Sequence, residues 1–439
     1  MDERKIMEIL TDWNFWGDFK EDLKVRSSYL SKLEGIFGRG AVAVLLGVRR
    51  AGKSSVAYLF IQGLIGRGLE PKNSLIVNFE DPRFPPEMSA SDLMQIYELY
   101  IKKLDPSDHV VLLDEVQNVA GWERFVRYLL ESKKVRALVT GSSSKLLGME
   151  ISTGLGGRHM DMEVFPLSFS EFLGFRGALP ETEIDLVKQR LKVLRLLEEY
   201  MRWGGFPEVV LSESEARKRA LLASYFSDIV VKDVAKRFGV REMEKLENLA
   251  GLSISNISTT HSLNRLKEAI GVSLDTVERF SEYLELARMF LSTRKFDYSK
   301  GRQLRSVRKV YAIDPGFFHV KGFRVSENYG RLAENIVAIE LFRRASFNPP
   351  AEIYYWRDYQ QREVDFVIKK GLKVTGLIQV CWDVGDPETK KREVRGLVKA
   401  MEEFKLREGL ILTEDFEGEE EVDGRRIVYR PLWKWLLGG

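Results

Sequence analysis

The segment Gly47-Val-Arg-Arg-Ala-Gly52-Lys53-Ser54 constrains the fold of this chain more than any other feature. It follows the apolar run AVAVLLG (41–47) and precedes the helical pattern SSVAYLFIQGL. Glycines let the backbone turn its N–H groups toward an anion, and the N-terminus of the next helix adds a favourable dipole. The pattern G-x-x-x-x-G-K-[ST] between a strand and a helix therefore predicts a phosphate-binding P-loop. The predicted nucleotide-binding residues are Gly47, Val48, Arg49, Arg50, Ala51, Gly52, Lys53, Ser54 and Ser55.

A second motif, His109-Val-Val-Leu-Leu-Asp114-Glu115, lies about 60 residues after the P-loop. Lys53 is predicted to neutralise the β and γ phosphates of ATP, or the β phosphate of ADP, and Ser54 to ligate Mg²⁺. Asp114 is predicted to hold the water shell of the metal, and Glu115 to act as base toward the attacking water. Together the two motifs predict ATP binding and hydrolysis.

Two further groups are weaker candidates for the same site. The strand VRALVTG (135–141) ends at Thr140 and is followed by Ser142, where a polar side chain could sense the γ-phosphate; a plain turn explains these residues as well. Arg158 follows a glycine-rich loop, and its guanidinium could stabilise charge on the phosphoryl oxygens as an arginine finger. A surface arginine is the alternative. If Arg158 acts on a neighbouring subunit, the protein must form a homo-oligomer.

Composition limits the class of protein. A chain of 439 residues with 44% apolar and 30% charged residues indicates two to four globular domains. Its 68 basic and 65 acidic residues give a net charge of +3, so a nucleic-acid partner can be argued only from a local patch. The single cysteine, Cys381, excludes an intramolecular disulfide. No run approaches the roughly 18 apolar residues of a membrane span, and we expect a cytoplasmic protein without export signal or membrane anchor.

Hydrophobic patterning predicts the order of the domains. Apolar runs alternate with helical patterns over the first 165 residues, as in a parallel α/β sheet. Helical periodicity follows at 185–203 and 216–238, broken at Gly204, Gly205 and Pro207. Three short helices and two strands between about 240 and 315 suggest a winged helix, and mixed α/β patterns return afterwards. The predicted domains are an ATPase core (1–175), a helical lid (176–239), a winged helix (240–320) and a C-terminal domain (321–439).

Several segments together carry a family resemblance: GVRRAGKSS, VVLLDEVQ, VTGSSSKLL, LGGRHMDMEVFPLSFSEFL, RWGGFPEVV and DIVVKDVAKRF. From about Ser28 to Leu436 the chain resembles the AAA+-type ATPases of archaea and bacteria that end in a nuclease-like domain. The resemblance implies a sheet with strand order 5-1-4-3-2. It also implies that residues 140–143 form the sensor-1 region and that Arg158 is the finger.

A basic patch lies between Arg288 and Lys309, where eight basic residues face the single acid Asp297. Its predicted nucleic-acid contacts are Arg294, Lys295, Lys300, Arg302 and Arg305, with Phe296 and Tyr298 interleaved. Basic side chains on a wing could reach DNA phosphates. A dimerisation module or a solvated charged hairpin remains the alternative.

The last 110 residues resemble the PD-(D/E)XK nuclease fold in their order of helix, three strands, helix and strand. Glu334 and Asp365 match its first two acidic positions, whereas Gln379 and Cys381 stand where Glu and Lys are expected. Gln379 brings no negative charge and Cys381 no fixed cation, so we favour a degenerate domain over an active nuclease. A lysine from the next helix, Lys390 or Lys391, could replace the missing one, although a solvated helix face explains both.

Three hypotheses about function follow. The first is a Mg²⁺-dependent ATPase whose nucleotide state changes how the later domains grip a partner, with DNA favoured. The second is a nucleotide-gated switch or scaffold that turns over slowly and binds a protein. The third is an ATP-gated, metal-dependent DNA nuclease.

Overall fold

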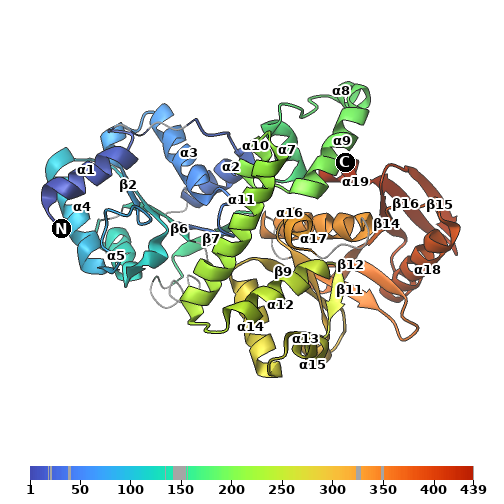
Figure 1. Ribbon diagram of the computed structural model, residues 1–439. Helices are drawn as coiled ribbons and strands as arrows, with labels where there is room; N and C mark the ends of the chain where they lie inside the picture. The colour runs from blue at the N-terminus through green and yellow to red at the C-terminus, as the bar shows by residue number, and fades with distance from the viewer. Residues whose placement is uncertain are drawn as a thin grey trace. The chain divides into compact units, whose positions relative to one another are not determined.

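The computed structural model describes residues 1–17, 19, 22–37, 41–133, 135–141, 155, 157–322, 328–347 and 351–438. The chain divides into two compact units, Met1–Val164 and Phe165–Gly439 (Figure 1). The predicted division into four domains remains a prediction. Helix α7 (Phe169–Phe175), which that prediction assigned to the ATPase core, belongs to the second unit.

The first unit is built on a five-stranded parallel sheet in the order β2-β4-β6-β1-β7. Its strands are β1 (Val42–Leu46), β2 (Ser74–Asn78), β4 (Val110–Asp114), β6 (Arg136–Gly141) and β7 (His159–Glu163). Read in chain order, this is the order 5-1-4-3-2 that the family resemblance implied, which confirms that prediction. Every residue of β1, β2 and β4 is buried, as expected for a parallel sheet covered on both faces.

Helices flank this sheet (Figure 1). They are α1 (Glu3–Trp13), α2 (Ser27–Phe37), α3 (Lys53–Gly66), α4 (Ala90–Leu104) and α5 (Trp122–Tyr128). The shorter elements are η1 (Pro71–Asn73), β3 (Met88–Ser89), η2 (Val116–Asn118), β5 (Val119–Ala120) and the π-helix η3 (Leu129–Lys133).

Helix α1 is an element that the sequence analysis did not predict. Its buried residues Ile6, Ile9 and Leu10 follow helical spacing and join the apolar core of the sheet. The side chain of Asn14, fully buried just after the helix, donates to Ile76 O at 2.8 Å and accepts from Ile76 N at 2.7 Å. One amide thus satisfies both main-chain groups of a residue in the edge strand β2, which fastens the N-terminal segment to the sheet.

The second unit begins with a helical region. Its elements are α7, α8 (Glu183–Lys188), α9 (Arg190–Trp203), α10 (Pro207–Leu211), α11 (Glu215–Asp228) and the π-helix η4 (Ile229–Lys236). The predicted break after α9 is confirmed at Gly204, which has a φ of 76°. A Cβ there would lie 1.7 Å from Asp314 Oδ1. Only glycine leaves room for this carboxylate, which accepts from Gly205 N at 2.7 Å.

The middle segment has the order helix, strand, helix, helix, strand, helix, strand, and the winged helix expected there remains a prediction. Its elements are α12 (Met243–Ser255), β8 (Thr259–His261), α13 (Leu263–Ile270), α14 (Leu274–Leu286), β9 (Phe290–Lys295), α15 (Lys300–Arg305) and β10 (Arg308–Ala312). Strand β10 pairs antiparallel with both β9 and β8. The predicted hairpin strands are therefore present, and the short helix α15 lies in the connection between them.

The C-terminal segment continues the same sheet. Strand β11 pairs parallel with β9 through Tyr354 and Arg294, so a single nine-stranded sheet runs in the order β15-β16-β14-β13-β12-β11-β9-β10-β8. Its further elements are α16 (Gly316–Lys321), α17 (Tyr329–Phe347), β11 (Ala351–Arg357), β12 (Glu363–Lys370), β13 (Lys373–Val380), α18 (Pro387–Phe404), β14 (Glu408–Thr413), β15 (Gly418–Val422), β16 (Arg425–Pro431) and α19 (Leu432–Leu436). The predicted helix, three strands, helix and strand are all present. The shared sheet was not predicted, because two separate domains were expected there.

Within the described residues, we find no helix that combines the length and the apolar character needed to cross a membrane.

Candidate functional site

The predicted P-loop connects β1 to α3 at the carboxyl end of β1. Gly47, Arg50 and Gly52 have φ of 144°, 68° and 92°, and these positive angles turn the loop back on itself before α3 begins at Lys53. A Cβ on Gly47 would lie 2.2 Å from Val164 O. The position accepts only glycine, because the adjoining end of β7 packs directly against it.

A buried arginine forms a hydrogen bond to the main chain of this loop. Arg26 is 3% exposed, and its Nη1 donates to Ala51 O at 2.9 Å. Its guanidinium lies 4.4 Å from the centre of the Tyr29 ring on α2. At the outer side of the loop, Arg49 pairs with Glu80 at 2.5 Å. Sequence reasoning had not singled out Arg26, because no motif marks an arginine that contacts the loop through a main-chain carbonyl.

Asp114 ends β4 with its carboxylate buried and surrounded by hydroxyl groups. It accepts from Ser54 Oγ at 2.8 Å, from Tyr58 Oη at 3.0 Å and from Thr140 Oγ1. Burial and the neighbouring charge of Glu115 raise the pKa of Asp114 to about 6, against the lowering effect of these hydrogen bonds. The first carboxylate of the second motif thus directly contacts the serine of the first. Tyr58, one turn into α3, is a contact that the motifs do not reveal.

Glu115 faces Lys53 across the site. The distance between Lys53 Nζ and Glu115 Oε1 is 3.6 Å, and both side chains are buried. Burial acts to raise the pKa of Glu115, but the Lys53 ammonium and the Gln117 amide outweigh it, and the net pKa is lowered. Glu115 is consequently ionised at neutral pH, so both of its carboxylate oxygens can accept hydrogen bonds.

The sensor prediction is only partly within the described residues. Thr140 is fully buried at the end of β6, where its Oγ1 donates to Asp114 and accepts from Glu115 N at 3.0 Å. It therefore joins the two acids to the central sheet. Ser142 lies outside the described residues. Val48, Ala51 and Ser55 belong to the loop and first turn of α3 as predicted.

Arg158 lies at the opposite end of the sheet from the P-loop. Its carbonyl accepts from Val42 N, at the start of β1, at 3.0 Å, whereas the P-loop follows Leu46 at the other end. Five residues of strand span about 16 Å. The side chain is 62% exposed and pairs with Glu131 at 3.0 Å. Within its own unit, Arg158 is therefore not brought into the nucleotide site.

Comparison with known proteins is consistent with this geometry. Residues 39–173 match the family described as an AAA domain. Over 407 residues the chain is 32% identical to the uncharacterized protein MJ1544 of Methanocaldococcus jannaschii, covering 90% of this chain and 88% of that protein. The chain belongs to this family of AAA-domain ATPases. Residues 194–326 and 329–433 match two domains of unknown function, DUF8612 and DUF4143.

Further relatives extend the comparison. The chain is 28% identical over 419 residues to an uncharacterized protein of Haemophilus influenzae, covering 94% of this chain and 98% of that one. A solved structure, the Walker-type ATPase PABY2304 of Pyrococcus abyssi, is similar with a TM-score of 0.48 and 15% identity, covering 69% of this chain and 96% of that one. The predicted membership among P-loop ATPases is confirmed by the AAA domain, which supports nucleotide-dependent activity in general.

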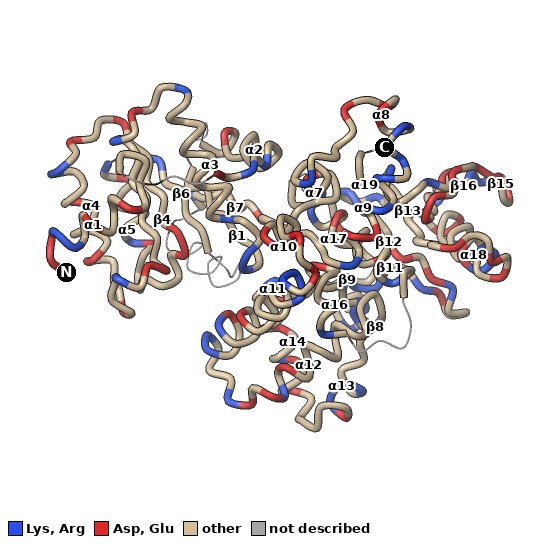
Figure 2. Tube along the Cα trace, turned by 45° about the horizontal axis from the view of Figure 1, so that its top comes forward, with Lys and Arg blue, Asp and Glu red and all other residues tan. Residues whose placement is uncertain are grey.

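The predicted nucleic-acid residues lie on β9 and α15 in the second unit. Arg294 donates to Leu304 O at 2.7 Å, Arg302 pairs with Asp297 at 3.0 Å, and Arg305 donates to Gly301 O at 3.2 Å. Lys300 is exposed and Lys295 is half-buried. Figure 2 shows basic and acidic residues interspersed along both units. The basic patch is thus present on one strand and the helix after it, with part of its charge already engaged.

The three residues predicted for a degenerate nuclease site come together in the second unit. Glu334 on α17, Asp365 on β12 and Gln379 on β13 are all at least nine-tenths buried. Asp365 N donates to Gln379 Oε1 at 3.1 Å, and Gln379 Nε2 donates to Glu393 on α18 at 2.7 Å. The side-chain oxygen of Gln379 therefore accepts a hydrogen bond from a main-chain N–H. Cys381 is buried in the apolar core of this segment, where burial raises the pKa of its thiol to about 11.

Sequence reasoning missed three members of this cluster: Lys309, Glu363 and Glu393. Lys309 on β10 forms ion pairs with Glu334, Glu363 and Asp365. Glu363 could have been found, because it lies two residues before Asp365 and so on the same face of the strand. Lys309 carries no local signal. It was counted with the basic patch, yet it is 3% exposed and is unavailable to a phosphate there.

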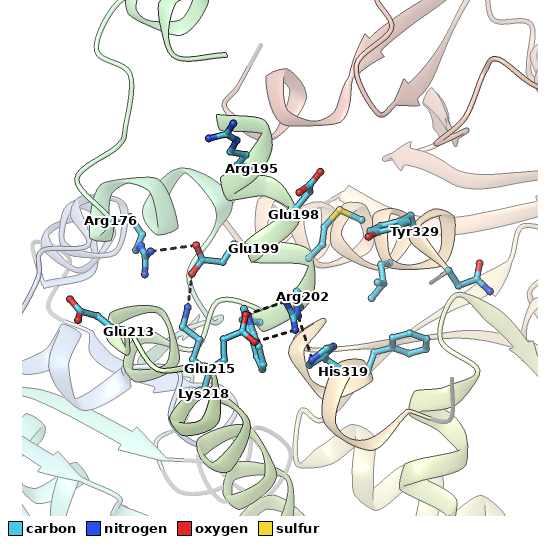
Figure 3. Close-up of a pocket in the computed structure, with 15 residues that line it drawn as sticks. Arg176, Arg195, Glu198, Glu199, Arg202, Glu213, Glu215, Lys218, His319 and Tyr329 are labelled. Carbon is cyan, nitrogen blue, oxygen red and sulfur yellow. Dashed lines mark hydrogen bonds and ion pairs between the residues drawn. The ribbon is translucent and has the colours of Figure 1, made fainter. Parts of the chain in front are cut away.

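A separate cavity of about 620 Å³ lies in the second unit among α9, α11 and α16 (Figure 3). Its charged side chains are largely paired with one another. Glu199 bonds to Lys218 at 2.5 Å and Arg176 at 3.4 Å, and Arg202 forms two bonds to Glu215 at 3.1 and 3.2 Å. No predicted site residue lies there.

Proposed function

We propose that this protein is a Mg²⁺-dependent ATPase whose nucleotide state controls how its second unit acts on a partner. The observation that supports it best is the direct contact between the two motifs. Ser54 and Asp114 are 60 residues apart in the chain and share a hydrogen bond at the carboxyl edge of the sheet. Ligands of parallel α/β sheets bind at this edge.

The described residues fit a magnesium nucleotide. The loop of 47–52 leaves no room for a Cβ at Gly47, and its main-chain N–H groups and Lys53 would hold the phosphates. Ser54 and Asp114 already lie within hydrogen-bonding distance of each other, close enough for Ser54 to ligate a cation whose water shell Asp114 would hold. Bound magnesium would neutralise the charge of the phosphates and help to orient them.

In the proposed reaction, Glu115 orients the attacking water and accepts its proton. Lys53 Nζ lies 3.6 Å from Glu115 Oε1. This distance is longer than a hydrogen bond, so the lysine can leave Glu115 and bind phosphate oxygens instead. Transfer of Lys53 from Glu115 to the nucleotide would free the carboxylate for water. Thr140 contributes by holding Asp114 and the main chain of Glu115 in register.

This proposal is tested by ATP turnover and ATP binding in Lys53→Ala and Glu115→Gln. Lys53→Ala is expected to weaken nucleotide binding strongly. Glu115→Gln is expected to retain ATP and lose turnover. Wild-type turnover in Glu115→Gln would remove Glu115 as the base, and failure of the wild-type protein to bind ATP or ADP in calorimetry would overturn the proposal altogether.

We further propose DNA as the partner, through Lys295, Lys300 and the neighbouring arginines. The proposal is supported by the clustering of these residues on β9 and α15, in the segment that is predicted to form a winged helix. Because neutralised phosphates release counterions, DNA-stimulated turnover should fall steeply between about 50 and 200 mM salt. Stimulation that is absent, or that survives high salt, would count against DNA.

The second candidate is a slow nucleotide-gated switch that binds a protein. It is favoured by the finding that Arg294, Arg302 and Arg305 already bond within the chain. An unchanged ATPase rate with DNA, together with no DNA binding near physiological salt, would support this candidate over the first.

Arg158 supports a further proposal of homo-oligomerisation, because it lies away from the P-loop of its own unit. Mixing Arg158→Ala subunits with Lys53→Ala subunits tests action between neighbours. Recovered turnover in the mixture, when each variant alone is inactive, is the expected result. Full activity of Arg158→Ala alone would exclude it as a finger.

A further inference from the structure

An ammonium group occupies the centre of the acidic cluster in the second unit. Lys309 Nζ lies 2.7 Å from Glu334 Oε1, 2.6 Å from Glu363 Oε1 and 2.8 Å from Asp365 Oδ1. The carboxylates come from α17 and β12, whereas the lysine comes from β10. A lysine and three acidic side chains from three elements therefore converge on one buried point.

The number of donors matches the number of acceptors. A lysine ammonium has three N–H donors and no acceptor, and each donor has one carboxylate oxygen within hydrogen-bonding distance. Buried carboxylates without such a partner are strongly destabilising. The Lys309 ammonium thus compensates the negative charge of the buried acidic side chains.

The remaining groups are also engaged. Asp365 Oδ2 accepts from Val380 N at 3.0 Å, and Gln379 Oε1 accepts from Asp365 N at 3.1 Å. Tyr311, two residues after Lys309 on β10, donates to Glu334 Oε1 at 3.0 Å. Among the described residues, no group of three or more His, Cys, Asp or Glu side chains is arranged to hold a metal ion.

Protein carboxylates bind Mg²⁺ and Ca²⁺ at about 2.0 to 2.6 Å, at the point where their oxygens converge. Here the ammonium stands at that point. A divalent ion could not enter without expelling a buried positive charge or lying against it at a cost in repulsion.

We propose that Lys309 is the resident cation of this cluster, replacing a divalent metal and fastening β10 to α17 and β12. The inference is independent of ATP hydrolysis. It accounts for two departures from the nuclease-like pattern. With the cation built in from β10, the chain does not need a lysine at Cys381, and Gln379 serves as a hydrogen-bonding bridge instead of a ligand.

The test is Mn²⁺ binding to the full-length, nucleotide-free protein. Electron paramagnetic resonance measures the bound Mn²⁺, and thermal unfolding measures its effect on stability. All chains carry Asp114→Asn, which removes a negative charge from the nucleotide site and so weakens any binding of Mn²⁺ there. The parent should take up no Mn²⁺ in the second unit. Lys309→Ala leaves three carboxylates around an empty position and should bind one Mn²⁺. At Mn²⁺ 100-fold above its dissociation constant, the unfolding temperature of Lys309→Ala should rise by about 5 °C.

Lys300→Ala is the matched control, because Lys300 is an exposed lysine in the segment between β9 and β10. It should gain no Mn²⁺ site. Adding Asp365→Asn to Lys309→Ala should abolish the gained site, which locates the ion in this cluster.

Two results would overturn the proposal. One is Mn²⁺ bound by the parent chain and lost in Asp365→Asn, which would mean that metal and lysine share the cluster. The other is a folded Lys309→Ala protein that gains neither Mn²⁺ nor thermal stability from it. If Lys309→Ala does not fold, Lys309→Ala with Glu334→Gln removes one of the uncompensated charges, and the same two outcomes decide.

Discussion

Lys53 in the first unit and Lys309 in the second are both buried beside acids, and they differ in how they are held. Lys53 lies 3.6 Å from Glu115, whereas Lys309 lies within 2.8 Å of three carboxylates. The first is loosely paired at the end of a glycine-bent loop and can turn to an incoming anion. The second has a partner for every N–H. The difference teaches where a buried lysine remains available: Lys53 still has an N–H to offer a ligand, whereas all three N–H groups of Lys309 are used within the chain.

The comparison is tested most strongly at Glu115, which should be needed for turnover rather than for folding. Glu115→Gln is expected to lower the ATPase rate by about 10³-fold, in the range found for loss of a general base. ATP affinity, measured by calorimetry, should be retained because the phosphates are held by Lys53 and the loop. Glu87→Gln, an exposed acid of the same unit, is the control. Equal rates in the two variants would contradict the assignment.

Lys309 should show the reverse behaviour, with a large effect on folding. Lys309→Ala is expected to lower the free energy of unfolding of the second unit by about 3 to 5 kcal/mol, because it leaves buried carboxylates unpaired. Chemical denaturation measures this change. Lys300→Ala should stay within about 0.5 kcal/mol of wild type. Similar losses in both variants would show that the ion pairs of Lys309 with the buried acids do not stabilise the second unit.

Asp314 sharpens the comparison, because it is a buried acid held by main-chain N–H groups of Gly205 and Gly316 instead of a lysine. Burial raises its pKa from 3.8 to about 7. The folded state therefore holds this proton more tightly than the unfolded state. Its stabilising contribution is complete below pH 3.8 and is lost as the pH rises to about 7.

Urea unfolding at stepped pH tests this sign. Relative to wild type, Asp314→Asn should gain up to about 1.4 kcal/mol per pH unit across that window. Asp297 is the control of opposite sign, because a hydrogen bond from Ser299 N and the nearby Arg302 lower its pKa. Asp297→Asn should lose relative stability as the pH rises. A flat difference for Asp314→Asn would mean that its carboxyl titrates normally.

The shape of the P-loop can be tested by comparing two glycines of the first unit. At Gly47 a Cβ would meet Val164 O at 2.2 Å with φ at 144°, whereas at Gly63 within α3 the nearest atom is Arg67 Nη1 at 3.7 Å. Gly47→Ala should cost about 1 to 3 kcal/mol of unfolding free energy. Gly63→Ala should stabilise the helix by about 0.5 to 1 kcal/mol. Thermal unfolding in which Gly47→Ala is neutral would show that β7 does not confine the loop.

The smallest expected effect is at Arg158, whose pair with Glu131 is exposed. Glu131→Gln should change the free energy of unfolding by about 1 kcal/mol or less, since exposed ion pairs contribute little. The measurement contrasts directly with Lys309→Ala. A loss of several kcal/mol would indicate that Arg158 is a structural residue and would weaken its assignment as a finger.

The first unit could be predicted from sequence to a large extent. Its strands are continuous apolar runs. Its two motifs follow β1 and β4, whose carboxyl ends lie at the same edge of the sheet with β6 between them, and Ser54 contacts Asp114 there. Helix α1 was missed because its apolar face is only Ile6, Ile9 and Leu10 between charged residues. Its attachment depends on Asn14 bonding to a strand about 60 residues later.

In the second unit the helices and strands were predicted, but the pairing of the strands into one sheet was not. The pairing of β9 with β11 merges two expected domains into one sheet. The partner of neither strand can be predicted, because parallel pairing leaves no signal in a single sequence. The basic patch was counted from the sequence as eight basic residues, of which Lys309 lies inside the molecule and Arg302 is paired with Asp297.

By itself, the sequence determined the P-loop, the second acidic motif and the alternation of strands and helices. These depend on residues close together in the chain, where backbone geometry and hydrophobic period act directly. Only the tertiary structure decided that Lys309 fills the acidic cluster, since Asp365 is 56 residues away from it. The contact exists because burial removes water from both groups and leaves each as the other's available partner.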